Sequence, residues 1–169
     1  MYPGERRGRA AEFKVKQLIE VAEWPHGDVV HTGDNGGPDL RVDGWCEVEV
    51  KTSGEVHYNK GKKSGSFRFN LQDLRRGHPL TEDVLVVRCE LANEPDVWFV
   101  IPGEVCWGHK WLRIPLSAVE MTTRRSKYAP FREAWGVLGE ILQRGRPLPS
   151  KPVIDRNQTY MKDGDDVPF

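Results

Sequence analysis

Asp39, Glu49 and Lys51 are the residues of this chain whose types and spacing suit metal-assisted chemistry. Nine residues separate Asp39 from Glu49, and one residue separates Glu49 from Lys51. Two carboxylates suit a hard cation such as Mg²⁺, which keeps several waters and completes its coordination with substrate phosphate. An ammonium group beside them can orient the attacking water or offset charge on the phosphate. The three residues therefore predict metal-dependent attack on a phosphate ester.

A β-hairpin is expected to bring these residues together. From Glu47 to Lys51 charged and apolar residues alternate, which is the period of a half-buried strand. Glu49 and Lys51 then point to one face of the sheet. Asp43-Gly44 predicts the turn before this strand, and Asp39 lies at the end of the preceding strand or loop. Glu47 shares the face of Glu49, as an outer ligand or as a plain surface charge.

An amphipathic helix is expected before the hairpin. It opens at Arg7, its apolar residues repeat at helical spacing from Ala11 to Ala22, and the pattern ends near Trp24-Pro25. At about 100° per residue, Glu12 lies on the edge of the buried stripe, from which its carboxylate can point toward the hairpin. An acidic residue in the first turns of a helix also favours the helix dipole without any active site. Both roles stay open for Glu12.

Pro38-Asp39 followed by Glu49-Val50-Lys51 resembles the signature of the PD-(D/E)xK nuclease superfamily. The order of a Gly-x-x-Ala-Glu helix, an Asp and a Glu-Val-Lys strand is similar to that of archaeal-type Holliday junction resolvases, over roughly residues 2 to 53. The resemblance implies an α/β fold of the restriction-endonuclease type, with a mixed sheet of four or five strands flanked by α-helices. It also implies Mg²⁺-dependent cleavage of DNA, with Mn²⁺ able to substitute, by a homodimer.

The resemblance also assigns roles to single residues. It makes Asp39 and Glu49 metal ligands, gives Lys51 a catalytic role, and makes Glu12 an accessory acidic residue at the metal. The backbone carbonyl of Val50 is a further candidate ligand. Resolvases of this type carry a hydroxyl residue in the loop before the Asp, and Thr32 is the candidate here.

The favoured function is structure-selective hydrolysis of phosphodiester bonds at four-way DNA junctions. One alternative is a sequence-specific restriction or homing endonuclease, whose base-reading loops residues 102–128 would supply. The other alternative is a DNA-binding module without catalysis on a nuclease fold. A cleavage assay that compares branched, duplex and single-stranded DNA separates these readings.

The charge distribution is consistent with a DNA partner, although the formal net charge is zero. Residues 1–16 and 54–80 are net basic, whereas residues 17–53, which hold the candidate metal site, are net acidic. Attraction of phosphate must therefore come from the rims of the site. Residues 57–66 suggest a flexible loop or the solvated tip of a hairpin. The candidate DNA-binding residues are Arg6, Arg7, Arg9, Lys60, Lys62, Lys63 and Arg68.

The rest of the chain is expected to complete one domain over residues 1–145. Aromatic residues in two of its elements, Trp98, Phe99, Phe131 and Trp135, are material for a dimer interface or for the core. From residue 146 onward a proline-rich, acidic tail is expected to be extended or disordered. The predicted elements are a buried central strand over 83–89, an antiparallel strand over 97–101, a short helix over 71–76 capped by Asn70, and a helix over 129–142. Residues 111–115 are a further candidate strand, in a stretch over 110–121 whose pattern does not decide its structure.

Composition excludes several classes of protein. There is no run of 18 apolar residues and no apolar stretch near Met1, so neither a membrane span nor a signal peptide is expected. The three cysteines have no paired spacing, which favours buried thiols in a reducing compartment over disulfides or zinc. No phosphate-binding glycine loop for ATP is found. A cytoplasmic protein of a prokaryote or its virus fits these features.

Overall fold

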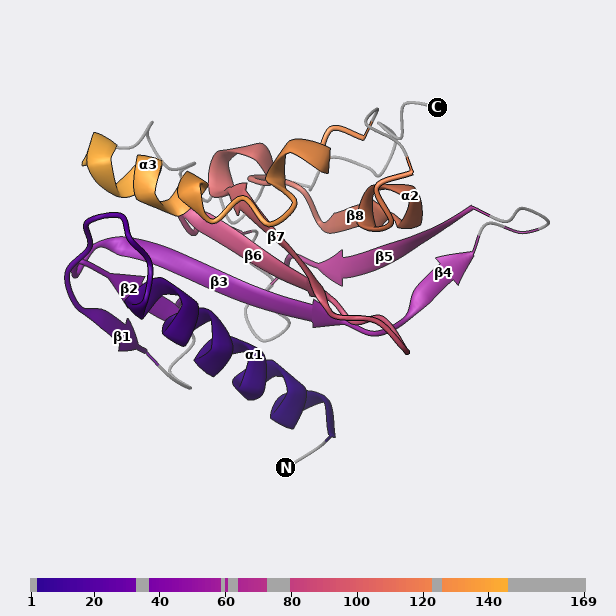
Figure 1. Cartoon of the computed structure of the whole chain (residues 1–169), viewed down its shortest axis with the longest axis horizontal. Coiled ribbons are helices and arrows are strands. Elements are labelled where there is room, and N and C mark those ends of the chain that lie inside the picture. Colours follow the sequence, from indigo (N-terminus) through magenta and orange to yellow (C-terminus); the bar gives the residue numbers. More distant parts are fainter. Residues whose placement is uncertain are drawn as a thin grey trace, which may run out of the picture.

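The structure is a computed structural model that describes residues 3–32, 37–58, 60, 64–72, 80–122 and 126–145. Among the described residues one long helix is followed by seven strands, and an eighth strand and the shorter helices come after them (Figure 1). The elements are α1 (Pro3–Glu20), β1 (Val29–His31), β2 (Leu40–Val42), β3 (Cys46–Ser53), β4 (Val56–Tyr58), β5 (Gly65–Asn70), β6 (Val84–Cys89), β7 (Val97–Pro102), η1 (Gly103–Val105), β8 (Trp111–Pro115), α2 (Leu116–Val119), η2 (Ala129–Phe131) and α3 (Gly136–Arg144).

A five-stranded mixed sheet forms the centre of the fold, in the order β1-β2-β3-β6-β7. β3 and β6 pair in parallel, while the other neighbours pair antiparallel. Parallel neighbours need a long connection, and here the β4–β5 hairpin lies within that connection. The expected α/β class, the mixed sheet and the interior place of the strand over 83–89 are confirmed.

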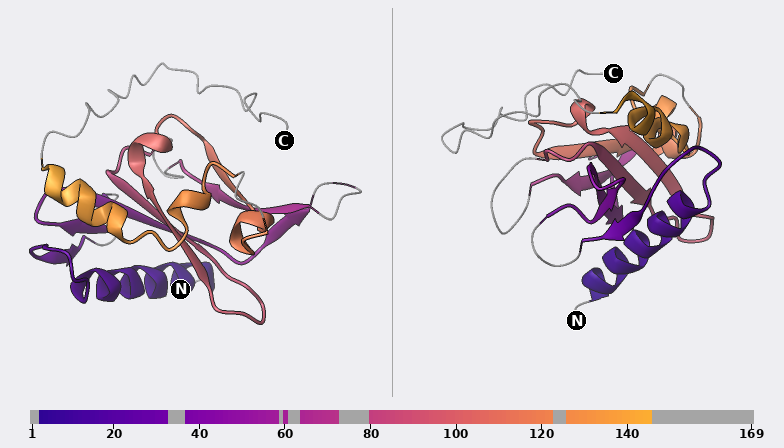
Figure 2. Two further views of the ribbon diagram at one scale, coloured as in Figure 1. Left: turned by 45° about the horizontal axis from the view of Figure 1, so that its top comes forward. Right: turned by 90° about the vertical axis from the view of Figure 1, so that its left-hand side faces the viewer.

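The two faces of the central sheet are covered differently (Figure 2). α1 and α3 bury apolar residues against one face, where Val48, Val84 and Val100 belong to the same cluster. A second sheet, in the order β4-β5-β8, covers the other face through Phe67, Phe69 and further apolar residues. This second sheet was not expected from the sequence.

The first helix forms as expected, with shifted ends. α1 buries Ala11, Val15 and Ile19 completely, which is the apolar stripe that the helical period predicted. It begins at Pro3 instead of Arg7 and ends at Glu20, a few residues before Trp24-Pro25.

The turn between β2 and β3 is a tight one. Asp43 and Gly44 both have positive φ, 53° and 72°, and the N–H of Trp45 donates to the carbonyl of Val42 at 3.1 Å. Two successive residues with positive φ define the type I′ turn, whose twist matches that of the strands it joins. The predicted turn at Asp43-Gly44 is confirmed, and it fixes the register in which Leu40 pairs with Val48.

The two ends of the stretch over 57–66, which was expected to be a flexible loop or the tip of a hairpin, are regular structure. His57 and Tyr58 belong to β4, and Gly65 and Ser66 belong to β5. Buried and partly exposed residues alternate through β5, because Phe67 and Phe69 pack into the core. Residues 57–58 and 65–66 are therefore paired strands of a hairpin. Residues 59 and 61–63 between them lie outside the described residues, so the two alternatives for the tip stay open.

The short helix expected over 71–76 is not seen where the structure describes the chain. Leu71 and Gln72 are not helical, and residues 73–76 lie outside the described residues. Oδ1 of Asn70 accepts a hydrogen bond from the N–H of Gln72 at 3.0 Å, which is the bond expected of a helix N-cap. The helix itself stays a prediction.

The helix expected over 129–142 is interrupted. A short 3-10 turn, η2, precedes α3, and Glu133 between them has a φ of 50°. The N–H of Glu133 donates to the carbonyl of Trp98 at 2.8 Å, and its Oε1 accepts from the N–H of Trp98 at 2.7 Å. Phe99 also forms a β-bridge with Arg132. These bonds to the edge of β7 hold Arg132 extended and Glu133 in the left-handed conformation, and this is why one continuous helix does not form.

The aromatic residues considered for a dimer interface pack within the monomer. Phe99 is fully buried and Trp98 is 8% exposed. Phe131 and Trp135 pack against the two core clusters. No helix among the described residues is long and apolar enough to cross a membrane. Residues 146–169, which were expected to form a tail, lie outside the described residues.

Candidate active site

The charged residues of β3 lie on one face of the strand, as its alternation predicted. Val48 and Val50 are buried in the cluster beneath α1 and α3. Glu49 and Lys51 point to the opposite face, where their neighbours on β6, Leu85 and Val87, belong to the cluster shared with the second sheet. Oε1 of Glu49 accepts a hydrogen bond from Nζ of Lys51, and the two side chains are 14% and 30% exposed.

Asp39 directly precedes β2 and reaches across to β3. Its Oδ2 accepts a hydrogen bond from the N–H of Val50 at 2.7 Å. The pairing of β2 with β3 begins at Leu40 and Val48, so the side chain of Asp39 continues the ladder beyond the end of β2. In a strand the N–H and the carbonyl of one residue point to the same edge. The carbonyl of Val50 therefore lies on the edge that faces Asp39.

The surroundings disfavour charge on both carboxyl groups. Burial raises the pKa of Asp39 to about 6, with help from the charge of Glu12, while the hydrogen bond from Val50 and the charge of Lys51 oppose the rise. Burial likewise raises the pKa of Glu49 to about 8, opposed by Lys51 and assisted by Asp39. The two carboxylates thus repel each other across a partly dry site.

Lys51 is held in its charged form by these acids. Burial alone would lower the pKa of its ammonium group. Attraction to Glu49, the hydrogen bond that Lys51 donates to Glu49, and attraction to Asp39 together raise the pKa above its usual value. Asp39, Glu49 and Lys51 therefore form one interacting set. This set can attract a cation to the carboxylates and present a positive charge beside it.

Glu12 lies at the margin of this set and not inside it. α1 packs on the face of the sheet opposite to Glu49, and Oε2 of Glu12 is 2.5 Å from Nε2 of His31. The imidazole of His31 also stacks on the ring of Phe13, with centroids 5.4 Å apart. The charge of Glu12 nevertheless raises the pKa of Asp39. The position fits an outer acidic residue that acts on Asp39 and is held by His31.

Glu82 is a further acidic residue near the site that sequence reasoning missed. Its charge raises the pKa of Asp39, Glu49 and Lys51 alike. Its Oε2 accepts a hydrogen bond from the N–H of Thr81 at 2.9 Å. Glu82 has no fixed spacing from the signature residues, and only the parallel pairing of β3 with β6 brings it near them. No local pattern signals this.

Two other residues considered from the sequence have defined contacts. Oγ1 of Thr32 donates to the carbonyl of Pro38, and the N–H of Thr32 donates to the carbonyl of Asp39 at 3.1 Å, so Thr32 closes the base of the loop that precedes Asp39. Glu47 lies opposite Arg41 on β2, with Oε1 and Nη2 3.4 Å apart. Glu47 is thus a cross-strand surface partner.

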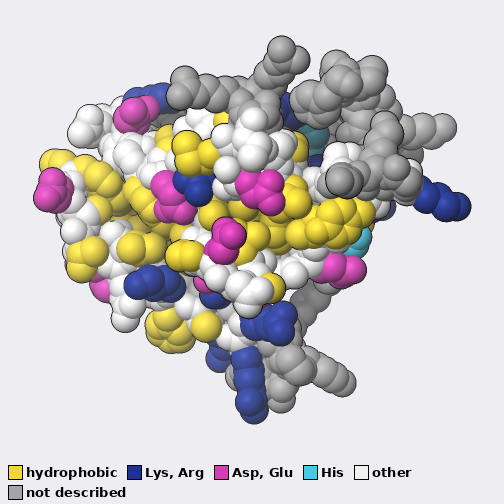
Figure 3. All heavy atoms as spheres, turned by 45° about the vertical axis from the view of Figure 1, so that its right-hand side comes forward, with side chains coloured by type: hydrophobic (Ala, Val, Ile, Leu, Met, Phe, Trp, Pro, Cys, Tyr) yellow, Lys and Arg dark blue, Asp and Glu magenta, His cyan; other side chains and the backbone are white. Residues whose placement is uncertain are grey.

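The candidate DNA-binding residues fall in two separate places. Arg6, Arg7 and Arg9 are exposed in the first half of α1, and basic side chains gather at the lower end of the molecule, where this part of α1 lies (Figure 3). Nη1 of Arg7 is 3.9 Å from Oε2 of Glu90. The other place is the β4–β5 hairpin, which carries Lys60 and Arg68, while Lys62 and Lys63 lie outside the described residues.

The donors around Asp39 suit a hard divalent cation in their chemistry. Two carboxyl groups with raised pKa values, that of Glu49 raised in part by Asp39, gain from a bound cation, and the backbone carbonyl of Val50 adds a neutral oxygen. Within the part of the chain that the structure describes, no three His, Cys, Asp or Glu side chains form a group that could hold a metal ion. A cation here would therefore rest on two carboxylates, with other oxygens completing its coordination.

Comparison of the chain with models of protein families, with curated proteins and with solved structures gives no match.

Proposed function

We propose that this protein is a Mg²⁺-dependent, structure-selective DNA endonuclease that resembles a Holliday junction resolvase. The observation that carries the proposal is the hydrogen-bonded set of Asp39, Glu49 and Lys51, in which two carboxyl groups with raised pKa share a site with an ammonium group whose pKa is also raised. Perturbed carboxyl groups beside a cation are typical of sites built for chemistry. The same residues carry the PD-(D/E)xK signature.

Each residue has a part in the proposed reaction. Asp39 and Glu49 hold Mg²⁺, or Mn²⁺ in its place, with the carbonyl of Val50 as a further ligand. A bound divalent ion supplies charge to neutralise the phosphate and to activate water. Lys51 orients the attacking water and offsets the charge that develops on the phosphate. Glu49 positions Lys51 through their hydrogen bond. Glu12 acts from outside, through its charge on Asp39.

The arrangement of the elements supports the finer classification of the fold. A helix packed on a sheet, a hairpin that presents Asp39 and Glu49, and a strand parallel to β3 are what the restriction-endonuclease type requires. The second sheet and the placement of both longer helices on one face are additions to that plan.

The exposed arginines support DNA as the partner. Arg6, Arg7 and Arg9 project from the first half of α1, the helix that also carries Glu12. Phosphate attraction from basic side chains outside an acidic centre is what a metal-dependent phosphodiesterase needs, because the carboxylates themselves repel the substrate.

A second candidate function is DNA binding without cleavage. It is favoured by the contacts that already occupy the two carboxylates, since Asp39 accepts from the N–H of Val50 and Glu49 accepts from Lys51. In this reading both groups only stabilise the hairpin, and added metal changes nothing.

A cleavage assay tests the proposal. A four-way junction, a linear duplex, a flap and a single strand are each incubated with the protein in Mg²⁺ at one concentration, with EDTA and the Asp39→Asn variant as controls. We expect cleavage that is strongest on the junction, absent in EDTA and absent with the variant. Binding of DNA without cleavage of any of the four in Mg²⁺ or Mn²⁺ would establish the second candidate instead.

A further inference from the structure

The outer face of the second sheet is polar and basic, and it is exposed at Trp111 and Arg113. Phe67, Phe69 and Leu112 point inward to the core, so the residues between them point outward. Figure 1 shows the β4–β5 hairpin projecting from the body of the molecule. None of the outward residues of the three strands is acidic. They are His57, Ser66, Arg68, Asn70, Trp111, Arg113 and Pro115.

Two arginines lie directly opposite each other on this face. Arg68 of β5 and Arg113 of β8 are cross-strand partners in the register of the sheet. Like charges in such a pair are destabilising. Nε of Arg68 is buried without a hydrogen-bond partner, and no ion pair between Arg68 and a described residue is found. Two adjacent guanidinium groups suit a phosphate, which they can bind with several hydrogen bonds at once.

An exposed indole stands beside this pair. Trp111 is 38% exposed, although large aromatic residues are highly buried on average. It lies opposite Asn70, in the same row of outward residues as Arg113. Aromatic side chains on an open sheet, next to basic residues that follow a phosphate backbone, are the means by which proteins bind unpaired strands.

We infer that the outer face of the β4-β5-β8 sheet binds a single-stranded segment of DNA, with Arg68 and Arg113 on its phosphates and Trp111 stacked on a base. The choice of DNA rests on the proposed function. The inference narrows the substrate to branched DNA that carries an unpaired arm, because a flush duplex offers no base to Trp111.

Binding of a labelled oligothymidylate of about 12 nucleotides, a length within the range that such sheets bind, tests this inference by fluorescence anisotropy. The assay is run in EDTA, so that it is independent of cleavage. The combined change Arg68→Gln and Arg113→Gln is expected to weaken binding at least about tenfold at low salt, and to lower the slope of log K against log salt by about 1.4 for two lost phosphate contacts. Trp111→Ala is expected to weaken binding at least about fivefold, whereas Trp111→Phe keeps most of it.

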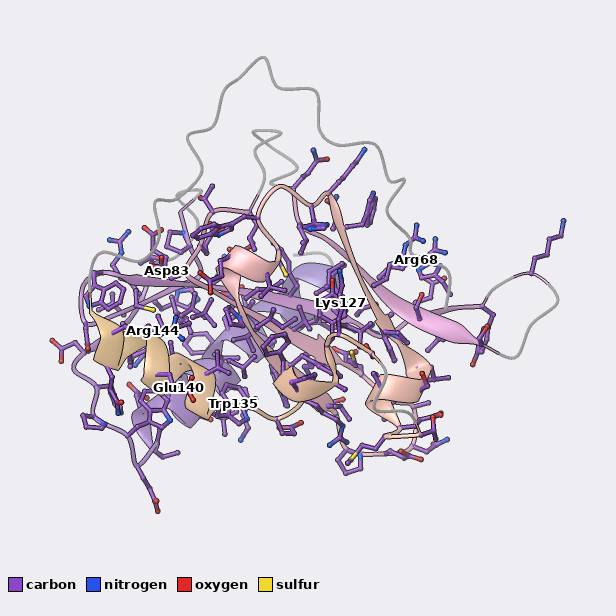
Figure 4. The ribbon with its side chains drawn as sticks, turned by 90° about the horizontal axis from the view of Figure 1, so that it is seen from above. Arg68, Asp83, Lys127, Trp135, Glu140 and Arg144 are labelled. Atoms are coloured by element: carbon purple, nitrogen blue, oxygen red, sulfur yellow. The ribbon has the colours of Figure 1, made fainter. Side chains whose placement is uncertain are left out.

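Arg144→Gln is the matched control. Arg144 is an exposed arginine near the end of α3, and it lies at the other end of the molecule from Arg68 (Figure 4). Its loss removes the same charge without touching the sheet, so binding should stay within about twofold of wild type. Quenching of tryptophan fluorescence by the oligonucleotide is measured on the wild type and on Trp111→Phe, and it should fall in the variant. Because phenylalanine is a conservative replacement, this readout does not depend on a variant that disturbs the sheet.

Several outcomes overturn the inference. If the double arginine variant bound the oligonucleotide with wild-type affinity, or if Arg144→Gln lost as much affinity, the site would not be on this sheet. Unchanged binding and unchanged quenching in the Trp111 variants show a general polyanion surface instead. The proposed function is judged separately: if no DNA is cut but the oligonucleotide binds as described, the nuclease fails and the inference stands. If DNA is cut and these variants bind normally, the inference fails alone.

Discussion

The carboxylate of Asp39 accepts a hydrogen bond from the backbone N–H of Val50, with Oδ2 and N 2.7 Å apart. At the other edge of β3, Oδ2 of Asp83 accepts from the N–H of Glu47 at 2.8 Å. The two aspartates thus extend the ladders of the same strand on both sides. They differ in their surroundings, because only Asp39 shares its site with the Glu49–Lys51 pair. Asp83 therefore has a structural role, whereas for Asp39 we propose a chemical one.

Removal of any member of the set should abolish cleavage while the fold survives. Asp39→Asn keeps a side-chain oxygen for the N–H of Val50 but removes the charge that would hold a metal. We expect Asp39→Asn, Glu49→Gln and Lys51→Ala each to lower the cleavage rate by about 10²-fold or more, with binding of DNA largely kept. Single-turnover kinetics measure the rate, and Glu47→Gln is the matched control. Near wild-type cleavage by Asp39→Asn or Glu49→Gln would show that the site is wrongly placed.

Asp83→Ala should have the opposite profile. Asp83 is 4% exposed, and its carboxylate lies where the pairing of β3 with β6 begins. The N–H of Asp83 also donates to the carbonyl of Glu47 at 2.9 Å. Loss of the acceptor leaves the N–H of Glu47 without its partner, at a cost of about 1–3 kcal/mol. Denaturant unfolding should show this loss, while Mg²⁺ affinity stays close to wild type. Wild-type stability with weakened Mg²⁺ binding would assign Asp83 to the metal site.

The raised pKa values predict how stability depends on pH without metal. The pKa of Glu49 rises from 4.5 to about 8 on folding, and that of Asp39 rises from 3.8 to about 6. Between these limits the folded state binds more protons than the unfolded state. The stability that these groups contribute is therefore fully present below pH about 4 and is lost as the pH rises toward 8, by at most about 1.4 kcal/mol per pH unit for each proton.

Glu49→Gln isolates this effect, because glutamine does not titrate. Denaturant unfolding in EDTA from pH 4 to 9 should show a flatter dependence for the variant than for the wild type. If Mg²⁺ binds the ionised carboxylates as proposed, its affinity should rise over the same pH range and its binding should release protons. If the variant kept the pH dependence of the wild type, the raised pKa of Glu49 in the folded state would be contradicted.

The local elements of the site could be predicted because their signals lie within short stretches of sequence. Alternation in β3 placed Glu49 and Lys51 on one face, and Asp43-Gly44 marked the turn that sets them beside Asp39. The helical period of α1 likewise gave its buried residues. Each of these signals is read from neighbours along the chain.

The features that were missed depend on contacts between distant segments. Glu82 approaches the site only through the parallel pairing of β6 with β3. The expected helix over 129–142 breaks because Glu133 bonds to Trp98 on β7, and the second sheet needs β5 to meet β8 across a long connection. In the stretch over 129–142, tertiary hydrogen bonds overrode helix propensity. No local pattern predicts such pairings.

Glu12 should affect activity through Asp39 and not as a main ligand. It contacts His31 and raises the pKa of Asp39 by its charge. We expect Glu12→Gln to reduce turnover and to change the Mg²⁺ concentration that half-maximal activity requires. A helix-dipole role alone would cost at most about 1 kcal/mol of stability and leave turnover unchanged. Kinetics across Mg²⁺ concentrations, combined with the melting temperature, separate the two roles, and Lys14→Gln on the exposed side of α1 is the control.

The resolvase proposal requires two catalytic centres, because one set of Asp39, Glu49 and Lys51 cuts one strand at a time. Two symmetric copies meet this need, since a twofold axis in the protein can match that of a four-way junction. The interface must use surfaces other than Trp98 and Phe99, which the core of the monomer buries. We expect a dimer at micromolar concentration by light scattering, tighter binding to junctions than to duplex at equal salt, and paired nicks symmetric about the branch point. A monomer that cuts linear duplex as readily as junctions would rule out a resolvase and leave a general or sequence-specific endonuclease.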